Sequence, residues 1–293
     1  MLPVNRDNVK TVLVLGASGK VGRLLRAVWS AQPPQGLRPL YQFRSGPAAP
    51  DTAIWAPGDP VQRLGSVDRV IALWGVTSGD ADALAQNTRL AITAMQIAQQ
   101  TGADRVLHCS SVAVYAPADH PLTETDRIAP TNPYGQAKAD MERAVLAHAP
   151  TGAHPCCLRI GSVAGAESLA ASVAAHRTGT STTPLTLDQF ANGHGPERSY
   201  IAPSDLAQAL AALCRIPLQS LPKALNLAAP QPVTMNQLLT AAQIPFAWRP
   251  APTSARQSAV LDTTRLSTLV PFDQNAGDPD RIVQDWLQWD AAT

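Results

Sequence analysis

The stretch Thr11–Arg23, TVLVLGASGKVGR, determines how we expect the rest of the chain to be arranged. Its first residues, Thr11–Leu15, form a short apolar run rich in β-branched side chains, which predicts a buried strand. Glycines follow at positions 16, 19 and 22, and the apolar residues after Lys20 recur at helical spacing. The stretch therefore predicts a strand, a glycine turn and a helix.

Such a turn is typical of dinucleotide-binding units. The first glycine permits the sharp turn, the second lets the backbone approach a pyrophosphate, and the third lets helix and strand pack closely. The helix N-terminus offers free N–H groups to the phosphates. The spacing is G-x-x-G-x-x-G rather than G-x-G-x-x-G, and an ordinary strand-to-helix turn is the alternative. The predicted cofactor contacts of the turn are Gly16, Ser18, Gly19, Lys20, Val21 and Gly22.

Composition narrows the possible partners of the 293-residue chain. The net charge is +1, and no basic run is present, so neither nucleic acid nor an anionic membrane is an expected partner. The first residues lack the apolar core of a signal peptide, and no stretch reaches membrane-spanning length. The four cysteines lack metal-ligand spacing. We expect a reduced, cytoplasmic protein that binds a small molecule and holds no metal.

The second and fourth predicted strands bear on the choice of cofactor. Arg38–Phe43 reads as a strand followed by Arg44, where an acidic residue would favour NAD and a cation favours the extra phosphate of NADP. NADP is slightly favoured over NAD, and a solvated loop arginine is the alternative. The strand from Val70 ends at Trp74 and Gly75, which we expect beside the cofactor, although Trp74 could equally belong to the core.

Three residues further along suggest proton transfer beside a nicotinamide. A predicted strand runs from Arg105 into Ser111, and a helix opens at Tyr134 with Lys138 one turn later on the same face. A tyrosine ionises near pH 10, and a neighbouring ammonium together with the nicotinamide charge would lower that pKa. Ser111 would donate a hydrogen bond to the substrate oxygen. The hydride transfer itself belongs to the cofactor.

The rest of the chain suggests a second, smaller lobe. We expect the segment from Gly161 to Tyr200 to be irregular and Ser204 to cap a helix over 205–215. Further helices are expected near 235–242 and over 279–289. The fold class is α/β, a doubly wound, mostly parallel Rossmann sheet with a smaller C-terminal substrate lobe. Residues 8–164 and the returning segment 200–229 would form the dinucleotide-binding domain, and 165–199 with 230–293 the lobe.

Together these motifs resemble an extended short-chain dehydrogenase/reductase of the NAD-dependent epimerase/dehydratase family. The resemblance rests on the segments 16–22, 110–115, 121–124, 132–138, 158–163 and 198–201, with Asn87, Glu142 and Asp205. It implies that Tyr134 is the acid/base, Lys138 its electrostatic partner and Ser111 the hydroxyl that orients the substrate. Asn87 would hold the active-site helix and strand in register.

The resemblance also implies how the substrate is held. Arg198 resembles the arginine that family members use on the diphosphate of a nucleotide sugar, and an ion pair within the fold is the alternative. Ser162 replaces a usual asparagine at the entry to the substrate segment, and Lys20 replaces a usual apolar residue. A homodimer through the helices that carry Asn87 and Tyr134 is also implied.

The predicted function is hydride transfer by an NAD(P)-dependent oxidoreductase or epimerase on a sugar-like hydroxyl or ketone, possibly linked to a nucleotide. Val112 and Ala113 follow Ser111 where dehydratases of the family carry an Asp-Glu pair, which disfavours dehydration. An NADPH-dependent reductase of a small carbonyl compound uses the same three residues and is one alternative. A non-catalytic NADP-binding sensor is the other.

Overall fold

The protein is described by a computed structural model that covers residues 9–147 and 152–290. A seven-stranded sheet, all of whose pairs are parallel, forms its centre in the order β11-β6-β5-β4-β1-β2-β3. Its strands are β1 (Lys10–Leu15), β2 (Leu37–Phe43), β3 (Thr52–Ile54), β4 (Arg69–Ala72), β5 (Arg105–Ser111), β6 (His154–Ile160) and β11 (Ala224–Leu227). The predicted Rossmann-like α/β fold is confirmed.

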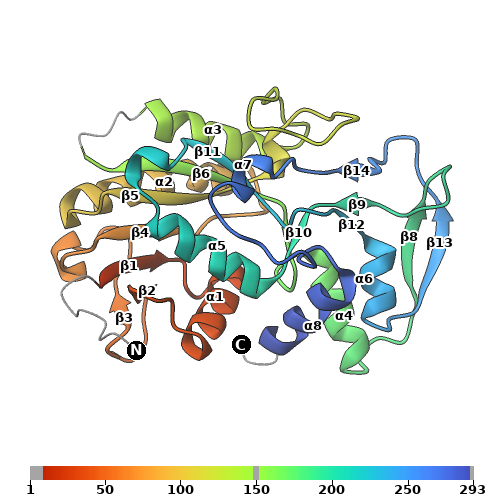
Figure 1. The fold of residues 1–293 in the computed structure, drawn as a ribbon, viewed down its shortest axis with the longest axis horizontal. Coiled ribbons are helices and arrows are strands. Elements are labelled where there is room, and N and C mark those ends of the chain that lie inside the picture. Colours follow the sequence, from red (N-terminus) through yellow and green to blue (C-terminus); the bar gives the residue numbers. More distant parts are fainter. Residues whose placement is uncertain (1–8, 148–151, 291–293) are drawn as a thin grey trace.

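Helices cover both faces of this sheet (Figure 1). On one face, α1 (Lys20–Ala31) and α5 (Pro203–Arg215) pack against apolar residues that include Val14, Leu107 and Leu158. On the other face, α2 (Ala81–Thr101) and α3 (Pro133–Ala147) pack against Leu13 and Val106. Alternate residues of a strand point to opposite faces, so each apolar run of the sheet contributes to both cores.

Local signals set the ends of the long helix α2. Asp80 is its N-cap and accepts a hydrogen bond from the Ala83 N–H at 2.8 Å. Gly102 ends it with φ of 87°, a left-handed conformation that glycine adopts without steric cost. Asp80 and Gly102 therefore set the two ends of the helix.

The segment from Gly161 to Tyr200 is not irregular, which corrects the prediction. It contains β7 (Ser162–Val163), α4 (Ser168–Arg177), β8 (Leu185–Gln189) and β9 (Glu197–Arg198), followed by β10 (Tyr200–Ile201). Strand β8 pairs in parallel with β13 (Phe246–Pro250), and β9 pairs with β12 (Val233–Thr234) and β14 (Ser258–Ala259). These partners lie tens of residues away, so the segment alone carries no sign of them.

The C-terminal lobe has its own apolar core. Leu169 and Val173 of α4, Leu238 of α6 (Met235–Ala241) and Trp286 of α8 (Pro279–Asp290) pack together there. The short helix α7 (Thr264–Ser267) and the single turns 61–64, 112–114 and 218–220 complete the described elements. The proposed division into two domains remains a prediction.

Ser204 does not cap α5, contrary to the prediction. The N-cap is Ala202, and the helix begins at Pro203, whose missing N–H costs nothing in the first turn. The Ser204 hydroxyl instead donates to Asp285 of α8 at 2.5 Å, and Asp205 accepts two hydrogen bonds from Arg281 at 2.6 and 2.7 Å. The first turn of α5 therefore anchors the last helix. Among the described helices, none is long and apolar enough to cross a membrane.

Candidate active site

The glycine turn after β1, called the glycine cradle below, packs too closely on its neighbours to accept larger residues at Gly16 and Gly22. Gly16 has φ of 82°, and a Cβ on it would lie 2.6 Å from the backbone nitrogen of Trp74. A Cβ on Gly22 would lie 2.3 Å from the Gly16 oxygen, so this glycine lets α1 approach β1. The N-cap Gly19 makes no side-chain cap bond, and the first turn of α1 holds no acidic residue. Its N–H groups are therefore suited to an anion.

A buried glutamine that the sequence analysis missed supports this turn. The Gln42 side chain on β2 accepts from the Gly16 N–H at 3.1 Å and donates to the Trp55 oxygen at 2.5 Å. A polar residue inside an apolar strand was the available signal, since a buried amide needs partners. Gln42 thus ties the turn to the neighbouring edge of the sheet.

Arg44 and Trp74, both predicted from strand ends to lie beside the cofactor, differ in their surroundings. Arg44 follows β2 and is exposed. The Trp74 ring packs at a tilt on Trp55, with 6.4 Å between ring centres, and its Nε1 is buried without a hydrogen-bond partner in the described chain. The Trp74 side chain is thus partly buried against the core, and its backbone borders the glycine turn.

Gly75, Asn87 and Lys138 meet at the carboxyl end of β4. A Cβ on Gly75 would lie 2.8 Å from Asn87 Oδ1 and 3.2 Å from Lys138 Nζ. Asn87 accepts from the Val76 N–H at 3.2 Å, and its amide donates to the Val76 oxygen at 2.9 Å. Asn87 therefore fixes the loop after β4 against α2.

The predicted serine, tyrosine and lysine lie together. Ser111 ends β5, where its Oγ accepts from the Ala113 N–H at 3.1 Å, and it lies near enough to Tyr134 of α3 to lower the pKa of that phenol. Lys138 Nζ lies 5.8 Å from the centre of the Tyr134 ring and donates to the Cys109 oxygen at 2.7 Å. The strand end and the first turns of α3 bring the three side chains to one place.

Burial affects the two titratable groups of this set in opposite directions. It raises the pKa of Tyr134 above its ordinary value, the nearby Cys109 raises it further, and the Ser111 side chain opposes both effects. Burial lowers the pKa of Lys138. Positive charge beside the phenol is therefore needed before Tyr134 can release its proton near neutral pH.

A buried polar network lies directly behind Ser111. Ser110 donates to Glu142 at 2.5 Å, and Arg159 forms a buried ion pair with the same carboxylate at 2.8 Å. Arg159 also donates to the Tyr115 hydroxyl at 3.0 Å, which in turn donates to Asn226 at 2.6 Å. Each of these groups is satisfied, so the network holds the ends of β5, β6 and β11 in one arrangement.

The predicted substrate residues lie on the lobe side. Ser162 on β7 pairs with the buried Tyr200 of β10 in a short parallel sheet. The Arg198 guanidinium donates to three backbone oxygens, those of Glu197 at 2.7 Å, Gln257 at 2.6 Å and Arg256 at 3.1 Å. Hydrogen bonds to backbone carbonyls therefore hold the Arg198 guanidinium where the alternative was an ion pair, and the charge of Glu197 acts on it from nearby.

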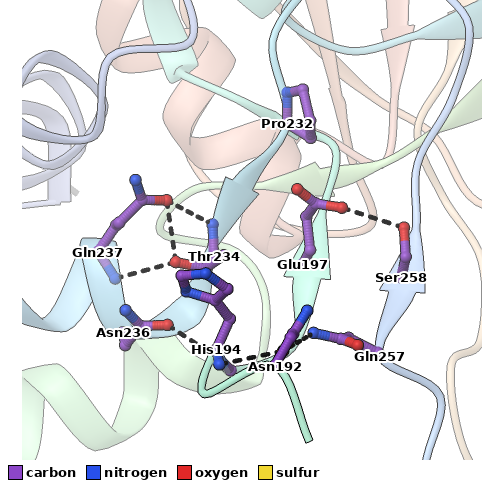
Figure 2. A pocket seen from close by; sticks show the side chains of 10 residues that line it. Asn192, His194, Glu197, Pro232, Thr234, Asn236, Gln237, Gln257 and Ser258 are labelled. Atoms are coloured by element: carbon purple, nitrogen blue, oxygen red, sulfur yellow. Dashed lines mark hydrogen bonds between the residues drawn. The ribbon is translucent and has the colours of Figure 1, made fainter. Parts of the chain in front are cut away.

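A separate pocket opens on the lobe, with a volume of about 570 Å³ (Figure 2). It is lined by Asn192, His194, Gly195, Glu197, Pro232, Thr234, Asn236, Gln237, Gln257 and Ser258. None of the predicted site residues lines it, and the sequence analysis did not single out its members for any role. Among the described residues, no group of three or more His, Cys, Asp or Glu side chains could hold a metal ion.

The fold and the cradle define a class, the Rossmann-type dinucleotide-binding enzymes. A family model, "NAD dependent epimerase/dehydratase family", matches residues 12–228. The chain belongs to this family and is an enzyme of it.

Several characterised proteins are similar to the chain. A UDP-glucose 4-epimerase of Lacticaseibacillus casei is 26% identical over 227 residues, which are 69% of this chain and 69% of that protein. The solved UDP-glucose-4-epimerase of Stenotrophomonas maltophila, with bound NAD and formylated UDP-arabinopyranose, has a TM-score of 0.78 at 20% identity and covers 97% of this chain and 98% of its own. A UDP-N-acetylglucosamine 4-epimerase of Methanobrevibacter ruminantium M1, in complex with UDP-N-acetylmuramic acid, has a TM-score of 0.76 at 16% identity, with coverage of 97% and 98%.

Proposed function

We propose that the enzyme moves hydride between a nicotinamide cofactor and a hydroxyl or ketone of a nucleotide-linked sugar, as an oxidoreductase or epimerase. The observation that carries this proposal is the convergence of Ser111, Tyr134 and Lys138 beside the glycine cradle. The nucleotide sugar is supported by the relatives, whose names and bound molecules are UDP-sugars.

The cradle fits a dinucleotide. Gly16 and Gly22 leave no room for a Cβ, which keeps the turn tight, and the α1 N-terminus is free of side-chain caps within the described chain. Gly16, Gly19 and Gly22 would border the diphosphate, and Gly75 would border the nicotinamide half. When bound, the nicotinamide accepts hydride from a sugar carbon and returns it.

Each residue of the set has a proposed role. Tyr134 takes the hydroxyl proton as hydride leaves the carbon and returns it in the reverse step. Lys138, which donates to the Cys109 oxygen, would stabilise the phenolate and bond the nicotinamide ribose. Ser111 orients the substrate oxygen. Arg198 would meet the diphosphate of the substrate, since its guanidinium forms no salt bridge with a carboxylate of the described chain.

Replacement of Tyr134 tests the catalytic assignment. We expect Tyr134→Phe to lower kcat with UDP-glucose or UDP-N-acetylglucosamine by about 10²–10⁴-fold while cofactor binding is retained. Turnover of a verified substrate at the wild-type rate would contradict the assignment. Native mass spectrometry of the purified enzyme separates the two reaction types, because an epimerase retains a tightly held cofactor whereas a reductase exchanges it each turnover.

We further propose that NADP is preferred, since a cation rather than a carboxylate follows β2. The solved neighbours carry NAD, which supports a nicotinamide cofactor without supporting this preference. Arg44→Ala should weaken NADPH binding several-fold and leave NADH binding unchanged, as measured by fluorescence titration. Equal losses for both cofactors, or none, would overturn the preference.

We propose a homodimer through the outer faces of α2 and α3, which pack side by side on one face of the sheet. Sedimentation velocity of the full chain measures the assembly directly. A monomer at micromolar concentration would remove this proposal without affecting the catalytic one.

A further inference from the structure

The pocket of the lobe lies on the face of its small sheet opposite Arg198. Glu197 pairs with Thr234 of β12 and Ser258 of β14, and all three line the pocket. Arg198, the next residue along β9, pairs with Val233 and Ala259 instead. Because successive side chains of a strand point to opposite faces, the pocket and the proposed diphosphate arginine belong to different sides of the sheet.

The lining offers both donors and acceptors of hydrogen bonds (Figure 2). Glu197 accepts from the Ser258 hydroxyl at 3.2 Å through one carboxylate oxygen, and Asn236 accepts from the Gly195 N–H at 3.3 Å. Asn192 accepts from Gln257 at 2.8 Å. The second oxygen of Glu197 and the amide NH₂ groups of Asn192 and Asn236 make no hydrogen bond to the described chain. They are available to a ligand whose groups both donate and accept.

An aromatic ring outside the lining contacts one of the lining residues, Gly195. Trp248 on β13 is 38% exposed, whereas Trp29, Trp55, Trp286 and Trp289 are each at most 5% exposed. Its six-membered ring lies against Gly195, where a Cβ would be 3.4 Å from two of its carbons. The edge-on contact with Phe246, at 5.2 Å between ring centres, fixes the orientation of the indole. An exposed indole held in place beside a polar pocket is not explained by the folding of the lobe.

We infer that the pocket is a second carbohydrate site, which takes the pyranose ring of an uncharged saccharide. The C–H face of such a ring packs on an indole, and its hydroxyls both donate to carboxylate oxygens and accept from amide NH₂ groups. A volume of about 570 Å³ lies within the usual range of small-molecule sites, about 300–1,000 Å³. Glu197 is acidic, and no lysine or arginine is among the lining residues, so an anionic sugar is disfavoured.

Saturation-transfer NMR and tryptophan fluorescence on the full chain test the inference, with D-glucose, D-galactose, N-acetyl-D-glucosamine and cellobiose as probes. We expect at least one probe to bind at millimolar concentration, and stronger binding of cellobiose would identify a glycan rather than a free sugar. Glucuronate should bind more weakly than glucose, and Glu197→Gln should reduce that difference. Trp248→Ala should weaken binding about tenfold.

Two controls keep the outcome clear. Ile128→Ala removes another exposed apolar side chain and should leave saccharide binding unchanged. Trp248→Ala should retain cofactor binding and turnover, so a loss of the second site is distinguishable from a failure of the proposed function. No binding of any probe up to the solubility of the sugars, or binding unchanged in Trp248→Ala, would overturn the inference.

Discussion

At the scale of the residue, replacing Gly22 and replacing Gly19, both in the turn after β1, should have different effects. Gly22→Ala would place a Cβ 2.3 Å from the Gly16 oxygen, so α1 must move off β1 and the protein should lose stability, by more than about 2 kcal/mol. Gly19→Ala places its Cβ 3.3 Å from the same oxygen, in a conformation alanine adopts readily. It should melt like the wild type and bind cofactor at least tenfold more weakly. Urea unfolding measures the stability of both variants, and cofactor titration measures their affinity. Equal losses of stability in the two variants would contradict the prediction.

His108 makes the stability of the protein depend on pH. The ring is fully buried, with Nε2 3.3 Å from Met95 Sδ and Nδ1 unpartnered in the described chain. Burial, and then the charge of Lys138, lower its pKa from 6.5 to about 3. Between these values the unfolded chain binds the proton and the folded protein does not, so stability falls as pH falls from 6.5 towards 3, by up to about 1.4 kcal/mol per pH unit.

The measurement is the difference in unfolding free energy between wild type and His108→Leu as a function of pH. We expect this difference to be constant above neutral pH and to change steadily in favour of the variant below pH 6.5. His120→Gln is the matched control, because His120 is exposed and its pKa is raised by the Pro121 carbonyl. A difference that does not vary with pH would show that His108 is not the responsible group.

At the scale of the element, the docking of α8 on α5 depends on the pair formed by Asp205 and Arg281. Asp205 is buried and accepts two hydrogen bonds from the partly exposed guanidinium. Asp205→Ala should lower the free energy of unfolding by about 1.5–3 kcal/mol, the usual range for hydrogen bonds to charged groups. The double variant with Arg281→Ala should lose less than the sum of the single losses.

A surface pair provides the comparison. In α3, Arg143 Nη1 lies 3.0 Å from Asp140 Oδ1, and the side chains are 72% and 44% exposed. Asp140→Ala should therefore change the free energy of unfolding by less than about 1 kcal/mol. Urea denaturation of the single and double variants gives all the required values. Additive losses for Asp205 and Arg281 would mean that the two side chains act independently.

At the scale of the whole molecule, α8 joins the two cores. Trp289 packs in the core on the α1 and α5 face of the sheet, and Trp286 packs in the core of the lobe, against Gly165. We therefore expect the sheet and the lobe to unfold in one calorimetric transition. The cofactor at about 100 times its Kd should raise the stability of the whole by about 2.7 kcal/mol. Two transitions, of which the cofactor shifts one, would show independent domains.

The amino-acid sequence by itself determined the central sheet, the glycine turn and the grouping of Ser111, Tyr134 and Lys138. Each depends on a local pattern: apolar runs for buried strands, glycines spaced for one turn, and a tyrosine and lysine one helical turn apart. Parallel strands share one carboxyl edge, so local patterns were enough to bring these groups together.

Only the tertiary structure decided the lobe and its contacts. The pairing of β8 with β13, the docking of Ser204 on Asp285 and the support that Gln42 gives to Gly16 join residues from 26 to 81 positions apart. No short-range pattern marks such partners, because their energy comes from packing and hydrogen bonds formed after the chain has folded back. The pocket beside Trp248 arises in the same way, from strands that meet only in the folded lobe.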